Sequence, residues 1–190
     1  MKVGVLALHG GFAEHVHAST RLGVSSLEIR RKQDLERSFD ALILPGGEST
    51  VMARLLGELG LFSPLREMLE GGLPVWGTCA GMILLAQELE GEEPSHFSFM
   101  PITVQRNAFG RQLGSFHKEG IFTGIGSVPM TFIRAPHIAR SEKNVHILAT
   151  HNGYGVAAKY ARMLVTAFHP ELTGDDRVLQ YFLEMAALTE

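Results

Sequence analysis

One cysteine of the chain lies between two glycines, at a spacing that suits a nucleophile. The segment is Gly77-Thr78-Cys79-Ala80-Gly81. Glycines two residues before and two residues after permit the tight strand-to-helix turn of the G-x-S-x-G pattern, with cysteine in place of serine. The dipole of the following helix favours a thiolate, and the Ala80 N–H is free to face a developing oxyanion. The alternative is that Cys79 is a small buried apolar residue, the usual fate of a lone cysteine. The two glycines favour the nucleophile.

A base and a carboxylate follow one another in His169-Pro170-Glu171. A thiol is mostly protonated at neutral pH, so a cysteine nucleophile needs a base within reach and a group that orients this base. The tripeptide follows an apolar segment, 163–168, that we expect to form a buried strand ending at the same sheet edge as Cys79. Residues two apart in an extended chain point the same way, so we expect Glu171 to reach the imidazole. The alternative is a surface turn with an incidental acid.

A glycine loop, Pro45-Gly46-Gly47-Glu48-Ser49, is expected at the same edge. Its backbone N–H groups are not shielded by side chains and precede a helix, so they can bind an anion or complete an oxyanion hole. The alternative is a plain turn capped by Ser49. This loop lacks the lysine of a phosphate-binding loop, and Gly10-Gly11 lacks the third glycine of a dinucleotide fingerprint, so nucleotide binding is not favoured.

The apolar pattern predicts the elements that hold these loops. Strands are expected over 2–8, 26–30, 41–44, 74–76 and 163–168, and helices over 12–22, 82–89 and 176–188. A further helix, capped by Ser49 or Thr50, carries an apolar stripe over 51–59. Short runs such as 102–105 and 130–134 favour antiparallel additions to the sheet. Alternation of strand and helix at both ends predicts a doubly wound α/β fold with a mostly parallel sheet.

Composition limits the kind of protein. With ~150 residues per domain as a guide, 190 residues predict a single domain over 1–190. The net charge is −3, without the basic excess that a nucleic-acid partner requires. One cysteine cannot form an internal disulfide, which favours a cytoplasmic protein. No run approaches the ~18 apolar residues of a membrane span, so no membrane partner is expected. His15 and His17 are not spaced as an i, i+4 metal pair, so we expect no metal.

Two more segments complete a resemblance to a known family. They are Arg106-Asn107-Ala108-Phe109-Gly110-Arg111-Gln112 and Phe132-Ile133-Arg134-Ala135-Pro136-His137-Ile138. With the three loops, they resemble the glutaminase subunits of pyridoxal 5′-phosphate synthase nearly end to end. The cysteine turn and His-Pro-Glu are shared with triad-type class I glutamine amidotransferases generally, whereas Pro-Gly-Gly-Glu-Ser-Thr and the two added segments point to this family.

The resemblance implies a flavodoxin-like class I glutaminase fold and hydrolysis of L-glutamine to L-glutamate and ammonia. No cofactor is expected in the glutaminase. Ammonia would pass to a synthase subunit that builds the pyridoxal ring, in a hetero-oligomeric complex that contacts exposed faces near Cys79. By the resemblance, Cys79 attacks the carboxamide, His169 transfers protons and Glu171 holds the imidazole tautomer. Water then cleaves a γ-glutamyl thioester.

The resemblance also implies the contacts made by the substrate. The N–H groups of Gly47 and Ala80 hold the oxyanion, after a flip of the Gly46–Gly47 peptide. The implied glutamine contacts are Gly46, Gly47, Glu48, Ser49, Arg106, Ile133 and Arg134. Arginine suits the α-carboxylate because its planar fork binds carboxylates bidentately. The alternative for Arg106 and Arg134 is ordinary surface ion pairing.

One position departs from the family pattern. The family usually carries Gln in a Leu-Gln-Gly sequence after the first strand, where it helps to organise the oxyanion loop, and this chain has Leu8-His9-Gly10. Histidine can still donate or accept a hydrogen bond, so the role of His9 stays open.

Two other functions share the same pattern. A cysteine peptidase on this fold would use the same Cys79 and His169, and activity toward peptides would reveal it. A regulatory or scaffold protein without activity would show a missing member of the triad, and none is missing.

Overall fold

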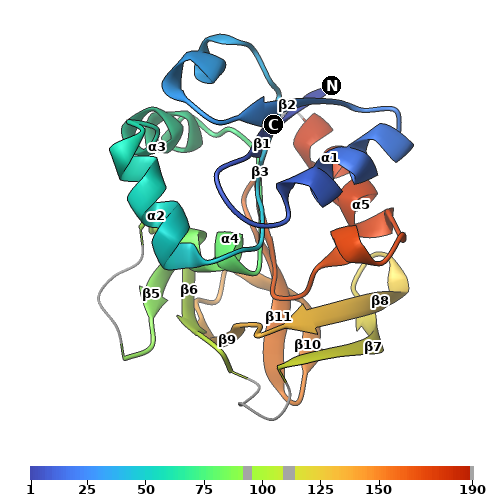
Figure 1. Ribbon diagram of the computed structural model, residues 1–190. Helices are drawn as coiled ribbons and strands as arrows, with labels where there is room; N and C mark the ends of the chain where they lie inside the picture. The colour runs from blue at the N-terminus through green and yellow to red at the C-terminus, as the bar shows by residue number, and fades with distance from the viewer. Residues whose placement is uncertain (92–95, 109–113, 189–190) are drawn as a thin grey trace.

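A large mixed sheet forms the centre of the molecule (Figure 1). The computed structural model describes residues 1–91, 96–108 and 114–188. Within these residues, the strand order is β2-β1-β3-β4-β12-β11-β9-β6-β5, with β10 paired to β11. The first five strands of this order run parallel to one another. They are β2 (Ser25–Ile29), β1 (Lys2–Leu6), β3 (Ala41–Leu44), β4 (Val75–Thr78) and β12 (Met163–Thr166). The predicted doubly wound α/β fold is confirmed.

The other half of the sheet carries the antiparallel additions. Its strands are β11 (Tyr154–Tyr160), β10 (His146–His151), β9 (His137–Ser141), β6 (Met100–Gln105) and β5 (Ala86–Leu89). β11 runs antiparallel to β12, β10 and β9, and β9 runs antiparallel to β6. β5 is parallel to β6. The predicted segment 102–105 therefore belongs to the main sheet.

The predicted segment 130–134 does not belong to it. β7 (Ser115–Phe122) and β8 (Gly126–Ile133) pair with each other in a separate two-stranded sheet. A connection of three residues joins them, and so short a loop favours local antiparallel pairing over a place in a distant sheet. Phe132 stacks on Phe116, with ring centroids 4.6 Å apart, and packs against Phe168 beyond β12. The hairpin thus lies across the end of β12.

Helices cover both faces of the parallel strands. Figure 1 shows α1 (Phe12–Arg21) and α5 (Arg177–Ala187) on one side and α2 (Ser49–Glu58) and α3 (Phe62–Glu70) on the other. The predicted apolar face of α5 is buried. α3 was not predicted, although Leu65 and Leu69 are buried one turn apart. None of the helices in the described part of the chain has the length and apolarity of a membrane span.

The helix predicted over 82–89 is wrong in its second half. α4 (Ala80–Leu85) ends at Ala86, whose φ of −58° and ψ of 143° leave the helical region. The chain continues as β5, where Glu88 pairs with Thr103 of β6 and accepts a hydrogen bond from its hydroxyl at 3.0 Å. Pairing with a neighbouring strand has overridden the local helix propensity.

Four loops meet at one edge of the sheet. Because β1, β3, β4 and β12 are parallel neighbours, their carboxyl ends lie side by side, which is where open α/β sheets bind ligands. The loops that follow these strands carry His9–Gly11, Pro45–Ser49, Cys79 and His169–Glu171. Behind them, the strands are buried except at the first residues of β1 and β12, with side chains such as Leu42, Ile43 and Trp76 in the core. The fold therefore gathers the predicted chemistry at this edge.

Candidate active site

Cys79 occupies a strained turn between β4 and α4. Its φ of 47° and ψ of −97° lie in a region that residues with a side chain rarely adopt. The flanking glycines make this turn possible, because a Cβ at Gly77 would lie 2.5 Å from the carbonyl carbon of Gly81. A Cβ at Gly81 would lie 2.1 Å from the carbonyl oxygen of Leu44 on β3. The structure forms the strand-turn-helix that the spacing of the glycines predicts.

The backbone at Cys79 is tied to the sheet. The Cys79 N–H donates to the Thr166 carbonyl of β12 at 2.7 Å. Ala80 is the first residue of α4, so its N–H has no acceptor within the helix. The Cys79 side chain is nearly buried, with Sγ 4.0 Å from the Ile133 carbonyl at the end of β8. The sulfur therefore lies next to the end of β8, at the residue that precedes α4.

His169 and Glu171 are in direct contact. Nδ1 of His169 lies 2.8 Å from Oε1 of Glu171. The expected extended backbone is wrong, because Pro170–Leu172 forms a 3-10 turn, η2. Proline suits the first position of such a turn, where its missing N–H is not needed. The turn brings the carboxylate back to the ring, so the predicted contact is made by a different backbone.

The pKa values of this pair are displaced in opposite directions. Burial disfavours the charged imidazole, but hydrogen bonds with Cys79 and Glu171 outweigh it and raise the pKa of His169 to about 10. Burial likewise disfavours the charged carboxylate, but the imidazoles of His15 and His169 hold the pKa of Glu171 below its usual range. At neutral pH an imidazolium therefore lies beside the sulfur, with an ionised carboxylate behind it. Such a charge stabilises a thiolate.

Gly46 packs directly against the triad. A Cβ at this position would lie 2.3 Å from Cε1 of His169 and 3.4 Å from Cβ of Cys79. The Gly46 carbonyl accepts a hydrogen bond from the Gly11 N–H at 3.0 Å. Because the C=O and N–H of a trans peptide point in opposite directions, the Gly47 N–H faces away from Gly11. Only a residue without a side chain fits between this loop and the imidazole.

His9 holds the same loop from the other side. Its Nδ1 accepts a hydrogen bond from the Glu48 N–H at 3.3 Å. A Cβ at Gly47 would lie 2.8 Å from this nitrogen. The histidine that departs from the family pattern is therefore in contact with the glycine loop.

Glu48 links the loop to α2 and to Arg106. Its Oε1 accepts hydrogen bonds from the Thr50 N–H at 3.4 Å and from Arg106 at 3.2 Å. Glu48, rather than Ser49 or Thr50, therefore caps α2, and the predicted cap is wrong. Glu48 can cap α2 because its side chain folds back toward the Thr50 N–H. A sequence pattern does not specify this side-chain conformation.

A cavity of about 420 Å³ connects these groups. It is lined by the three triad side chains and by every residue that the resemblance implies for glutamine, namely Gly46, Gly47, Glu48, Ser49, Arg106, Ile133 and Arg134. Its size is within the range of small-molecule sites. Residues 109–112 of the predicted arginine segment lie outside the described residues. No group of three or more possible metal ligands is found among the residues that the structure describes.

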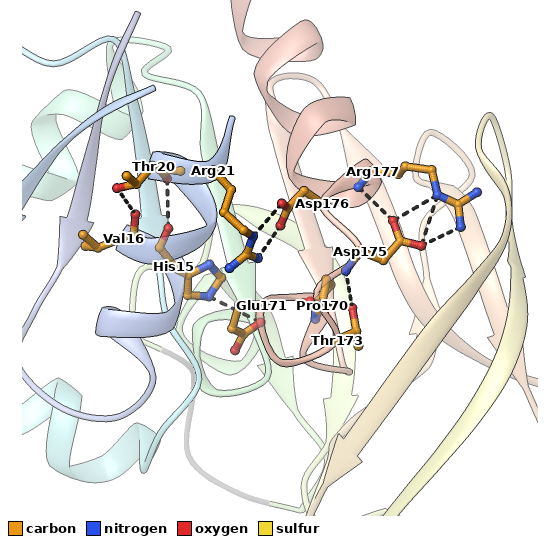
Figure 2. A network of polar contacts seen from close by, with 11 residues as sticks. His15, Val16, Thr20, Arg21, Pro170, Glu171, Thr173, Asp175, Asp176 and Arg177 are labelled. Carbon is orange, nitrogen blue, oxygen red and sulfur yellow. Dashed lines mark hydrogen bonds and ion pairs between the residues drawn. The ribbon is translucent and has the colours of Figure 1, made fainter. Parts of the chain in front are cut away.

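His15 lies behind the triad and was not predicted to have a role there. It is fully buried on α1, with Nε2 3.1 Å from Oγ1 of Thr78 and 3.6 Å from Oε2 of Glu171. Its ring meets the Trp76 ring edge to face, with centroids 5.2 Å apart. Figure 2 shows the imidazole of α1 pointing toward the carboxylate of η2. The sequence signal that could have indicated this role is the position of His15 on the inward face of the predicted helix.

Comparisons with known proteins show the family of the chain. Residues 5–188 match the model of the SNO glutamine amidotransferase family. A relative from Methanocorpusculum labreanum, named pyridoxal 5′-phosphate synthase subunit PdxT, is 56% identical over 100% of both chains. A protein of the same name from Streptococcus pneumoniae is 51% identical over 97% of each chain.

Solved structures show the same fold. A crystal structure titled as a glutamine amidotransferase superposes with a TM-score of 0.91 at 44% identity, covering 98% of this chain and 99% of that one. A putative GMP synthase subunit from Thermoplasma acidophilum has a TM-score of 0.70 at 17% identity, over 98% and 94% of the two chains. The second likeness concerns the fold alone.

Proposed function

The chain belongs to the SNO glutamine amidotransferase family, and from this premise we propose that it is the glutaminase subunit of a pyridoxal 5′-phosphate synthase. It hydrolyses L-glutamine to L-glutamate and ammonia and delivers the ammonia to the synthase subunit. The observation that carries this proposal is the common cavity of Cys79, His169 and Glu171. Full-length relatives named as subunits of this synthase support the assignment.

In the first half of the reaction, Cys79 forms a thioester with the substrate. The thiolate attacks the side-chain carboxamide carbon, and the resulting oxyanion is held by the N–H groups of Ala80 and Gly47. When the tetrahedral intermediate collapses, the C–N bond breaks and the imidazolium of His169 gives its proton to the departing nitrogen, which leaves as ammonia. Glu171 keeps Nδ1 of the ring paired, so that Nε2 is the nitrogen that exchanges protons.

In the second half, water releases glutamate. The neutral His169 takes a proton from water, whose oxygen attacks the γ-glutamyl thioester carbon. The C–S bond then breaks, glutamate leaves, and the thiolate and imidazolium are restored. The same oxyanion contacts serve both halves, because each passes through a tetrahedral intermediate.

The charges around the cavity suit a free amino acid. Glu48 and Arg106 form an ion pair at 3.2 Å, and both line the cavity. A zwitterionic ligand can take over both partners, with its α-ammonium on the carboxylate and its α-carboxylate on the guanidinium. Arg134 and the backbone of Ile133 complete the rim on the side of β8.

The ammonia requires a shielded route to the synthase. Free ammonia is protonated in water and is then no nucleophile, so direct transfer between the subunits protects it. We place the docking face next to the cavity, where Leu172 is 45% exposed at the end of η2. The cytoplasmic location stays a prediction from the single cysteine.

The test is glutamine turnover by the purified chain, with and without its synthase partner. Ammonia and glutamate should form in equal amounts with the partner present, and Cys79→Ala should abolish both. A diazo-ketone analogue of glutamine should label Cys79 alone, detected by mass spectrometry of its tryptic peptide. Full turnover by Cys79→Ala would contradict the proposal. Cleavage of peptide substrates with no glutamine turnover would point to a peptidase instead.

A further inference from the structure

The outer oxygen of the triad carboxylate is buried without a hydrogen bond among the described residues. Oε1 of Glu171 faces His169, but Oε2 has no partner within hydrogen-bond distance. The side chain of Glu171 is 1% exposed. The gap around it, bounded by α1, β4 and the η2 segment, has no volume that accepts a water molecule. Nε2 of His15 lies 3.6 Å from it.

The surroundings of His15 determine which nitrogen carries its proton. Nε2 lies near two oxygens, Oγ1 of Thr78 and Oε2 of Glu171, whereas Nδ1 is buried with no partner in the described part of the chain. A proton on Nδ1 would leave a buried donor unpaired and would also leave Oε2 without any N–H directed at it. A proton on Nε2 leaves only an unpaired acceptor, which is the smaller penalty. The structure therefore favours the neutral ring with its proton on Nε2.

Other contacts fix the ring relative to η2. The Trp76 indole meets it edge to face, and the hydroxyl of Ser19 donates to the His15 carbonyl at 2.9 Å. α1 is joined to the segment after η2 by Arg21, whose guanidinium makes two hydrogen bonds with Asp176, at 2.6 and 2.8 Å (Figure 2). The imidazole and the carboxylate are therefore held by elements that are themselves tied together.

We propose that His15 is a positioning residue of the triad. Its Nε2–H lies between Oγ1 of Thr78, at 3.1 Å, and Oε2 of Glu171, at 3.6 Å, and its attraction for Oε2 holds the carboxylate with Oε1 toward His169. A distance of 3.6 Å exceeds an ordinary hydrogen bond, but the gap between His15 and Glu171 has no room for a water molecule that would screen the attraction between this N–H dipole and the carboxylate. The effect on turnover is indirect, because His15 acts through Glu171 and does not line the substrate cavity. The inference rests on the proposed glutaminase function.

The charges that face His15 come from three segments. Burial holds its pKa below the ordinary value, Glu171 and Glu14 oppose this shift, and His169 adds to it. Asp175 and Asp176 border the same gap but are paired with Arg177 and Arg21. β4 contributes only the neutral Thr78 and Trp76. The ring is therefore neutral at neutral pH and acts as a dipole.

The test compares two substitutions at His15 in the complex with the synthase. His15→Phe keeps a ring but removes the N–H, His15→Gln keeps an N–H donor, and the exposed His17→Phe on the same helix is the matched control. The measurements are kcat and KM for glutamine as a function of pH. Titration with the diazo-ketone analogue gives the fraction of intact sites, so that loss of folded protein is not mistaken for slower catalysis.

We expect His15→Phe to lower kcat about 10- to 100-fold, as for a small displacement of a catalytic group, with KM within about threefold because the substrate cavity is untouched. The acid limb of the pH dependence of kcat, where activity falls at low pH, should move to higher pH in this variant, because Glu171 then becomes easier to protonate. His15→Gln should restore most of kcat and the position of this limb, and His17→Phe should match the wild type. A kcat within twofold of the wild type for His15→Phe would overturn the proposal. So would equal losses in both His15 variants with an unmoved acid limb, which would indicate packing alone.

A second measurement does not depend on turnover or on the variants folding. Nitrogen-15 NMR of the histidine rings in the full-length wild-type chain reports the tautomer of His15. A neutral ring protonated at Nε2 supports the proposal, and a ring protonated at Nδ1 or at both nitrogens overturns it. Absence of glutaminase activity in the wild-type complex would instead contradict the proposed function.

Discussion

Gly81→Ala tests whether the close approach of α4 to β3 positions the nucleophile. The new Cβ would lie 2.1 Å from the Leu44 carbonyl oxygen, whereas ordinary contact begins at 3.4 Å, so the two backbones must separate by about 1.3 Å. The obstacle is backbone on both sides and cannot move away as a side chain would. Overpacking of this kind costs about 1–3 kcal/mol of unfolding free energy. A 1 Å misplacement of catalytic groups costs about 10²-fold in rate. Gly81→Ala should therefore lose about 100-fold in kcat while remaining folded.

The assay is partner-stimulated ammonia release together with urea unfolding of the isolated chain. Gly57→Ala is the matched control, because Gly57 is exposed on α2 and an added Cβ meets nothing within 4 Å. Alanine there should stabilise the chain by about 0.5–1 kcal/mol and leave turnover unchanged. If Gly81→Ala matched Gly57→Ala in both stability and kcat, the argument that α4 must lie against β3 would be refuted.

Substitutions at three further positions follow from the geometry. Glu171→Gln should lower kcat about 10²- to 10⁴-fold. The pKa of His169 is raised to about 10. The contribution of its charged ring to folding stability is therefore complete below pH 6.5 and is lost as pH rises through 10. In urea unfolding, the loss of unfolding free energy in Glu171→Gln should be largest near pH 6 and vanish toward pH 10. Arg21→Ala removes a partly exposed ion pair and should cost less than about 1 kcal/mol in urea unfolding, with a larger loss contradicting its surface character. His9→Gln should keep an acceptor for the Glu48 N–H and stay within about twofold of wild-type kcat. His9→Ala should lose about tenfold in kcat, as expected for the loss of one hydrogen bond. Equal kcat values for the two variants would exclude a role for this hydrogen bond.

The features that the sequence predicted correctly depend on short-range constraints. The turn at Cys79 is specified by two glycines within two residues of it, and the contact of His169 with Glu171 is made within one tripeptide. Parallel strands such as β3 and β4 could be predicted because they are apolar runs, buried on both faces, that are followed by a turn. Their shared edge then follows from topology alone.

The features that were missed depend on residues far away in the sequence. Residues 86–89 form a strand only because β6 lies beside them. The capping role of Glu48 depends on the fold of its side chain, and its charge is shared with Arg106, 58 positions away. The place of His15 requires α1, β4 and η2 to be packed together, and no local pattern contains that information.

The backbone at Cys79 sets a limit on how stable a working version of this protein can be. A non-glycine residue held in such a conformation costs of order 1–3 kcal/mol, and glycine would release that cost while removing the sulfur. Selection or design for heat resistance alone would therefore drive this position toward an inert chain. Thermostabilised variants should be sought with position 79 held fixed, and an unusually robust isolate should first be sequenced there.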